Sequence, residues 1–184
     1  MKKAPVILNK LNLLVLFLLL ISASGSKDRK LELKFHLNDI QSFVPSYQMA
    51  IWIENTDGTF IRTLFLSEYL SYGGYNLPEI CPEWSKKAAW ENVSKEEFDA
   101  VTGATPGTGE VDLKLTCPGN ILPEGKYRLF VEVHLVDEYN ELYTSDIEIS
   151  GKKGTGEFKV SYINGKCPKK LEGDLLTGVT VKYK

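Results

Sequence analysis

The chain has 184 residues, with 22 Lys and Arg against 24 Asp and Glu, and a formal net charge of −2. This mildly acidic balance argues against a nucleic-acid partner, because few cations are available to neutralise a phosphate backbone, and the basic pairs at 152–153 and 169–170 are too short to change that. The length is sufficient for one domain with a proper core and short for two packed domains.

Residues 1–25 have the order of a secretory signal peptide. Lys2, Lys3 and Lys10 precede an apolar run over 11–21, and the small residues of 22–26 follow. We predict cleavage after residue 24 or 25. The alternative is a permanent membrane anchor, but about eleven apolar residues span only ~17 Å as a helix, against a hydrocarbon core of about 30 Å.

The predicted cleavage leaves residues 26–184 as a single exported domain. It removes three of the 22 cations and no acid, so the mature chain has 19 basic and 24 acidic side chains and a net charge of −5. We therefore expect a periplasmic or otherwise extracytosolic protein with an acidic surface.

The amino-terminal half alternates apolar and polar residues with a period of two, which predicts β-strands. In the first strand, Leu31, Leu33 and Phe35 face one side. Residues 47–66 are a predicted hairpin, because Asp57-Gly58 supplies a tight turn between two apolar runs. Trp52 lies on the opposite face from its apolar neighbours, so both faces of that strand are expected to be partly covered.

Further strands are predicted in the carboxyl-terminal half and are separated by Gly, Pro and Asn turn signals. They span residues 111–115, 127–136, 146–149, 157–163 and 178–183. About eight short strands without a long helical repeat favour an all-β fold, an immunoglobulin-like antiparallel β-sandwich.

Residues 80–101 interrupt this pattern with helix-forming sequence and predict a short helical insertion. Ser94 and Glu97 have the spacing of a capping box, which opens a helix with Phe98 and Val101 on one face. Because an insertion of this kind usually covers one end or edge of a sandwich, it is the first place to seek function.

The insertion ends in the segment 99–107, which has a plain structural interpretation. Gly103 can terminate the helix as a C-cap, and Pro106 prevents it from restarting. Asp99 is then a solvated helix residue, and the segment is an ordinary loop.

The same segment also resembles the flavinylation motif Asp-x-x-Ser/Thr-Gly-Ala-Thr, which ApbE-type flavin transferases recognise. Asp99, Thr102, Gly103, Ala104 and Thr105 match all five specified positions. The motif occurs in the flavin-carrying subunits of sodium-pumping quinone reductases and Rnf complexes. The resemblance implies that the Thr105 hydroxyl is esterified to the phosphate of FMN, with the other four residues as the transferase recognition motif.

A second resemblance covers about residues 45–150. The hairpin that contains Trp52-Ile53-Glu54, the segment 99–106 and the run 122–132 are similar, in order and spacing, to an uncharacterised family of predicted periplasmic proteins. This resemblance implies an exported β-sandwich associated with flavin transferases and membrane-bound redox partners. The chain departs from it in its three cysteines and in the residues after Gly151.

Cys81, Cys117 and Cys167 remain after the predicted cleavage. In an oxidising compartment one disulfide and one free thiol is the simplest outcome, and the three pairings stay open. Their spacing predicts no metal site. His36 and His134 are each alone on a predicted strand and are interpreted as exposed or hydrogen-bonded strand residues.

Five aromatic residues lie near the motif in sequence. Flat aromatic faces can stack on an isoalloxazine ring, but such residues more often pack an insertion onto its sheet, and core packing is favoured here. The five are Tyr69, Tyr72, Tyr75, Trp84 and Trp90.

The leading hypothesis is a non-enzymatic, extracytosolic electron carrier with FMN covalently attached to Thr105. The alternative is an immunoglobulin-like binding or structural module in which 99–107 is an ordinary loop. An enzyme is the third and least favoured hypothesis, because the sequence contains no recognisable catalytic triad, paired carboxylates or phosphate-binding loop.

Overall fold

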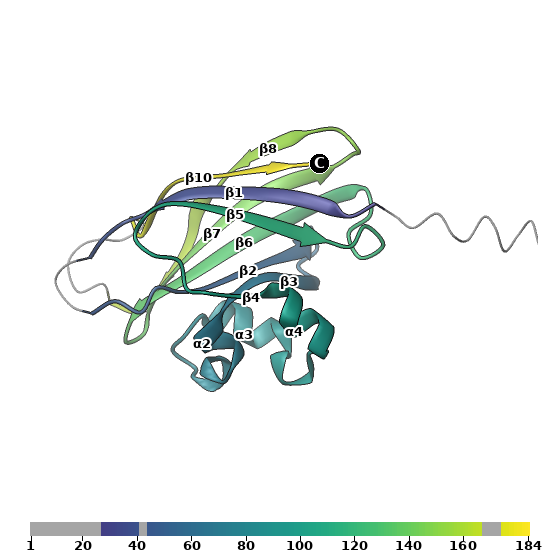
Figure 1. Ribbon diagram of the computed structural model, residues 1–184. Helices are drawn as coiled ribbons and strands as arrows, with labels where there is room; N and C mark the ends of the chain where they lie inside the picture. The colour runs from purple at the N-terminus through teal and green to yellow at the C-terminus, as the bar shows by residue number, and fades with distance from the viewer. Residues whose placement is uncertain (1–26, 41–43, 167–173) are drawn as a thin grey trace, which may run out of the picture.

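The computed structural model describes residues 27–40, 44–166 and 174–184, which form two packed β-sheets with a layer of short helices on one of them (Figure 1). The four-stranded sheet has the order β5-β1-β10-β8, and the six-stranded sheet has the order β4-β3-β2-β6-β7-β9. The strands are β1 (Arg29–Leu37), β2 (Gln48–Asn55), β3 (Phe60–Ser67), β4 (Thr102–Gly103), β5 (Gly109–Cys117), β6 (Gly125–Val136), β7 (Tyr139–Ile149), β8 (Gly154–Glu157), β9 (Lys159–Asn164) and β10 (Leu176–Tyr183).

All strand pairs are antiparallel except β3 with β4, which is parallel. The predicted all-β sandwich is therefore confirmed. The signal peptide predicted over residues 1–25 lies outside the described residues. In the described part of the chain, no helix is long and apolar enough to cross a membrane.

The main core lies between the two sheets. The alternation in β1 buries Leu31, Leu33, Phe35 and Leu37 against apolar residues of the six-stranded sheet, and it leaves the polar residues of β1 on the outer face. The hairpin predicted for residues 47–66 is formed by β2 and β3, and Gly58 in its turn has a φ of +88°, which glycine adopts without strain.

A second core lies on the outer face of the six-stranded sheet, beneath the helices (Figure 1). Trp52 is 1% exposed and stacks on Phe130 of the adjacent strand, with ring centroids 4.8 Å apart. The sequence prediction that both faces of this strand are covered is confirmed. The helical elements are α2 (Glu68–Ser71), η1 (Gly74–Asn76), α3 (Pro82–Ala88), η2 (Trp90–Asn92) and α4 (Lys95–Val101).

The helical insertion begins at residue 68 and not at the predicted residue 80. Its first two elements are one turn long, and such short helices carry no periodic signal in a sequence. Helix α3 is capped from outside the insertion, because the Glu132 carboxylate of β6 accepts hydrogen bonds from the backbone N–H groups of Glu83 (3.2 Å) and Trp84 (2.9 Å).

The prediction of a single strand over residues 157–163 is wrong. The chain changes sheets at Phe158, so that β8 pairs with β10 in the four-stranded sheet and β9 pairs with β7 in the six-stranded sheet. The Phe158 N–H bonds to the carbonyl of Val179 at 3.1 Å, between the two strands. The apolar and polar pattern continues across this switch, which hides the break in the sequence.

Candidate functional site

The segment 99–105 connects the edges of the two sheets. It begins on α4, contributes β4 at the edge of the six-stranded sheet, and continues into β5 at the edge of the four-stranded sheet (Figure 1). Residues 104–107 have no regular secondary structure. A second protein can therefore reach this segment from the side of the sandwich without displacing a central strand.

Asp99 lies on the exposed surface of α4. Ser94 caps this helix as predicted, because its Oγ accepts from the Glu97 N–H at 3.1 Å. One turn later, Asp99 Oδ2 lies 2.6 Å from Lys95 Nζ. This exposed ion pair can exchange for a different partner at little energetic cost.

Thr102 and Gly103 form β4 and fix the motif to the sheet. They pair with Leu66 and Ser67 of β3. A Cβ atom added to Gly103 would lie 2.7 Å from the ring of Phe65, which is closer than real Cβ contacts. Gly103 is therefore required by its close approach to the core, and its predicted role as a helix C-cap is wrong because Thr102 occupies that position.

Thr105 is half-buried, and its hydroxyl is held by one side chain of β2. Gln48 Nε2 donates a hydrogen bond to Thr105 Oγ1 at 3.2 Å and another to the Ser46 carbonyl at 3.2 Å. A hydroxyl has two acceptor lone pairs and one donor, and no described residue accepts from the Thr105 hydroxyl. Its proton is therefore available to an external base, while Gln48 fixes the oxygen.

Two oxygen atoms beside the motif lack hydrogen-bond partners. Among the described residues, the buried side-chain atoms without a partner are Gln48 Oε1 and Thr102 Oγ1. Buried polar atoms are nearly always paired in folded proteins, so unpaired ones need an explanation. Both are located on residues that belong to the motif or contact it, so the unsatisfied polar groups are concentrated at this site.

Gln48 was not found by sequence reasoning. It precedes Thr105 by 57 positions, and a contact between the start of β2 and the segment that joins the two sheets cannot be deduced from local pattern. The one available signal is a polar residue that opens a strand in which seven of eight residues are buried.

The structure separates the five aromatic residues near the motif into three groups. Trp84 and Trp90 are buried in the second core, which confirms core packing for both. Tyr69 and Tyr72 are 54% and 71% exposed, on or beside α2, an element that contacts β4. Tyr75 is partly buried against the second core.

Cys81 and Cys117 are both free and buried, so the expectation of a disulfide is wrong for this pair. The reason is topological, because Cys81 lies in the core under the helices and Cys117 lies in the core between the sheets. Burial raises the pKa of the Cys81 thiol well above its ordinary value and that of Cys117 to about 11, so both stay protonated and unreactive. Cys167 lies outside the described residues.

Both histidines have hydrogen-bonded strand positions, as predicted. His36 is exposed and lies 2.8 Å from Glu110, and His134 is buried 3.3 Å from Asn140 Oδ1. Burial lowers the pKa of His134, which favours the neutral ring. Over residues 27–40, 44–166 and 174–184, no group of three or more His, Cys, Asp or Glu is arranged to hold a metal ion.

These features define an all-β sandwich protein whose sequence motif lies at the junction of its two sheets. The chain belongs to a family described as predicted periplasmic protein (DUF2271), which it matches over residues 30–162. The family supports the extracytosolic location that the amino-terminal leader predicts, and the match includes the whole 99–105 segment. No curated protein and no solved structure is significantly similar to the chain.

Proposed function

We propose that the protein is an extracytosolic electron carrier with FMN covalently bound to Thr105 as a phosphoester. In this proposal it is the substrate of an ApbE-type flavin transferase and exchanges electrons with a membrane-bound redox partner. The observation that carries the proposal is the Thr105 hydroxyl, which lies in an accessible, irregular segment with its oxygen held by Gln48 at 3.2 Å and its proton free.

The attachment is a phosphoryl transfer from a flavin dinucleotide to Thr105. The hydroxyl oxygen attacks the phosphorus of the FMN half, its proton passes to a base of the transferase, and the pyrophosphate bond breaks to release the nucleoside monophosphate. A threonine hydroxyl is a weak nucleophile without such a base. The Gln48 amide donates to the same oxygen and orients it without competing for the proton.

The surroundings of Thr105 contain groups that suit a bound FMN. The exposed rings of Tyr69 and Tyr72 offer flat faces for a flavin ring. When bound, FMN supplies reversible electron transfer, and the protein sets its exposure and hydrogen bonding.

The test is co-expression with a flavin transferase, followed by a denaturing gel that is inspected for flavin fluorescence after boiling. We expect a fluorescent wild-type band and a dark Thr105→Val band. Thr108→Val is the matched control, because it makes the same change at an exposed position three residues beyond Thr105, and it should remain fluorescent.

Two results would contradict the proposal. A dark wild-type band would exclude the carrier and favour the immunoglobulin-like binding or structural module. Equal fluorescence of the wild type and Thr105→Val would show that the flavin is attached at another residue.

A further inference from the structure

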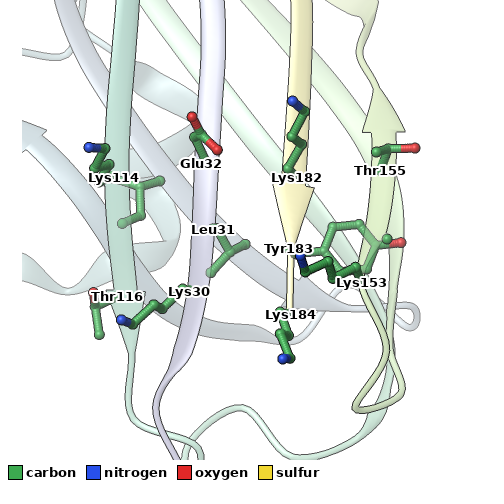
Figure 2. Close-up of a pocket in the computed structure, with 12 residues that line it drawn as sticks. Lys30, Leu31, Glu32, Lys114, Thr116, Lys153, Thr155, Lys182, Tyr183 and Lys184 are labelled. Carbon is green, nitrogen blue, oxygen red and sulfur yellow. The ribbon is translucent and has the colours of Figure 1, made fainter.

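The outer face of the four-stranded sheet has a cluster of five lysines at one end, which we call the lysine face. Its members are Lys30, Lys114, Lys153, Lys182 and Lys184, and together with Glu32 they line a shallow hollow of about 750 Å³. Figure 2 shows Glu32 between Lys114 and Lys182 on the adjacent strands, and the strand registers place the three directly opposite one another.

On this outer face of the sheet, the charged side chains at one end form ion pairs, and the five lysines at the other end do not. Toward the other end, Lys34 lies 3.0 Å from Glu32 and 3.0 Å from Asp112, and His36 lies 2.8 Å from Glu110. By contrast, none of the five lysines forms an ion pair with any residue that the structure describes. The single carboxylate within the lysine face is already engaged by Lys34.

Two of the lysines are placed unfavourably for folding alone. Lys30 and Lys184 are directly opposite on β1 and at the end of β10, joined by two backbone hydrogen bonds of 3.3 and 3.1 Å. Like charges at opposed positions of adjacent strands destabilise a sheet. A positive cluster at this position, in a chain whose predicted mature charge is −5, therefore indicates a negatively charged partner.

The composition of the lysine face is not typical of a protein–protein interface. Protein interfaces are enriched in Tyr, Trp and Arg and depleted of Lys. The lysine face has no arginine, and the large exposed apolar residues of the described chain all lie elsewhere: Val44, Tyr69, Tyr72, Val160 and Tyr162.

A single bound anion is also a poor match. Strands in a sheet are about 4.8 Å apart, so lysines on β5, β1 and β10 spread their charge over ~10 Å or more and do not converge on one point. Lysine is a flexible point charge without the fixed fork of arginine, and it suits a broad, diffuse negative surface.

We propose that the lysine face binds the surface of a bilayer that contains anionic phospholipid. Each lysine near such a surface contributes about a fivefold gain in affinity, so five of them are sufficient for reversible binding at low ionic strength. The partner is consistent with the protein's location, because a periplasmic protein is enclosed by membranes. This inference does not rest on the flavin proposal.

The orientation that results would leave the motif accessible. Lys30 lies opposite Thr116 near one end of the β1–β5 pair, and the segment from Thr105 enters β5 at Gly109, opposite Leu37 at the other end. The seven residue steps from Lys30 to Leu37 span ~23 Å in an extended strand. The lysine face and Thr105 are therefore at opposite ends of the sandwich.

The test is co-sedimentation of the exported protein with vesicles at low salt. We expect binding to an equal mixture of phosphatidylglycerol and phosphatidylcholine, none to phosphatidylcholine alone, and loss of binding as salt screens the charges. Replacing Lys30, Lys114 and Lys182 together with Gln should weaken binding about hundredfold, and Glu32→Gln should strengthen it several-fold.

A second triple variant controls for net charge. Replacing Lys86, Lys95 and Lys126 with Gln removes the same charge from exposed positions on other elements and should leave binding within about twofold of wild type. Equal weakening by the two triple variants, equal binding to neutral vesicles, or no binding to anionic vesicles would each overturn the proposal. Retention of the wild type on an immobilised acidic protein without vesicle binding would instead assign the face to a protein partner.

Discussion

The outer faces of the two sheets differ in what covers them. The six-stranded sheet lies under the helical insertion, and its outer face buries three tryptophans. No described residue covers the four-stranded sheet in this way, and its outer face carries Lys, Glu and Asp side chains. The difference is visible in single strands, since β1 alternates between buried and exposed residues whereas β2 is buried on both faces except at its last residue.

The two sheets also differ in how their polar side chains are held. Burial on both faces makes an unpaired polar group of the covered sheet costly, so that most of its polar side chains are hydrogen-bonded. Glu54 accepts hydrogen bonds from Trp52 Nε1 and Lys87 Nζ, both at 2.6 Å, and Gln48 donates to the Thr105 hydroxyl. The covered sheet therefore holds individual polar side chains in hydrogen bonds, and the four-stranded sheet presents a surface of charged side chains.

The largest expected effect is the removal of a tryptophan from the covered face. Trp84 is fully buried, and its Nε1 donates to Thr63 Oγ1 at 3.0 Å. Trp84→Ala should lower the free energy of unfolding by about 3 to 5 kcal/mol, measured by urea denaturation. Lys114→Ala on the uncovered face should change it by less than about 0.5 kcal/mol. Similar small effects for both would mean that the insertion is not part of the cooperative core.

The second effect is a pH dependence that arises from the covered face. Burial raises the pKa of Glu132 from 4.5 to about 7, so the folded protein retains this proton to a higher pH than the unfolded chain does. The resulting stabilisation is complete below pH 4.5 and is lost as the pH rises through 7. The total stabilisation that is lost over this pH range is about 3 kcal/mol.

Glu132→Gln should remove this component, because an amide does not titrate in that range. Urea denaturation of both proteins from acidic to neutral pH should therefore show a wild-type stability that falls with pH relative to the variant. Parallel pH profiles for the two proteins would contradict the raised pKa of Glu132.

A smaller effect is expected where the motif joins the two sheets. Gly103→Ala places a methyl group against the Phe65 ring and should destabilise the protein by about 1 to 3 kcal/mol through overpacking. Gly107→Ala is the matched control, because nothing lies within 4 Å of its added Cβ. If thermal denaturation shows the same midpoint for both variants, the close packing of β4 is not a constraint on the motif.

The smallest effect is expected on the exposed surface of α4. The ion pair between Lys95 and Asp99 is exposed on both sides, and exposed pairs of this kind contribute little to stability. Lys95→Ala should therefore change the urea midpoint only slightly, and added salt should abolish the difference. A large fall in the urea midpoint that persists in added salt would show that Asp99 is held in place by more than this pair.

Much of the fold could be predicted from local sequence pattern. Alternation at Leu31 to Leu37 and the Asp57-Gly58 turn are determined by residues close in the chain, and both appear as predicted. The sheet switch at Phe158 and the helices at 68–76 could not be predicted, because they depend on contacts with β10 and with the second core.

The candidate site shows the same division. The five motif residues are recognisable in the sequence, and the capping of α4 by Ser94 was predicted from spacing alone. The role of Gln48 was not predicted, because its contact with Thr105 depends on how the segment between the two sheets folds against the start of β2. The two unpaired oxygens of Gln48 and Thr102 are likewise properties of packing and not of sequence.

The central claim is tested most directly by mass spectrometry of the protein co-expressed with a flavin transferase. Trypsin should release residues 96–114, which contain Thr102, Thr105 and Thr108. We predict that this peptide gains the mass of FMN less one water, and that fragmentation places the gain on Thr105. An unmodified peptide, or a gain located on Thr102 or Thr108, would contradict the account.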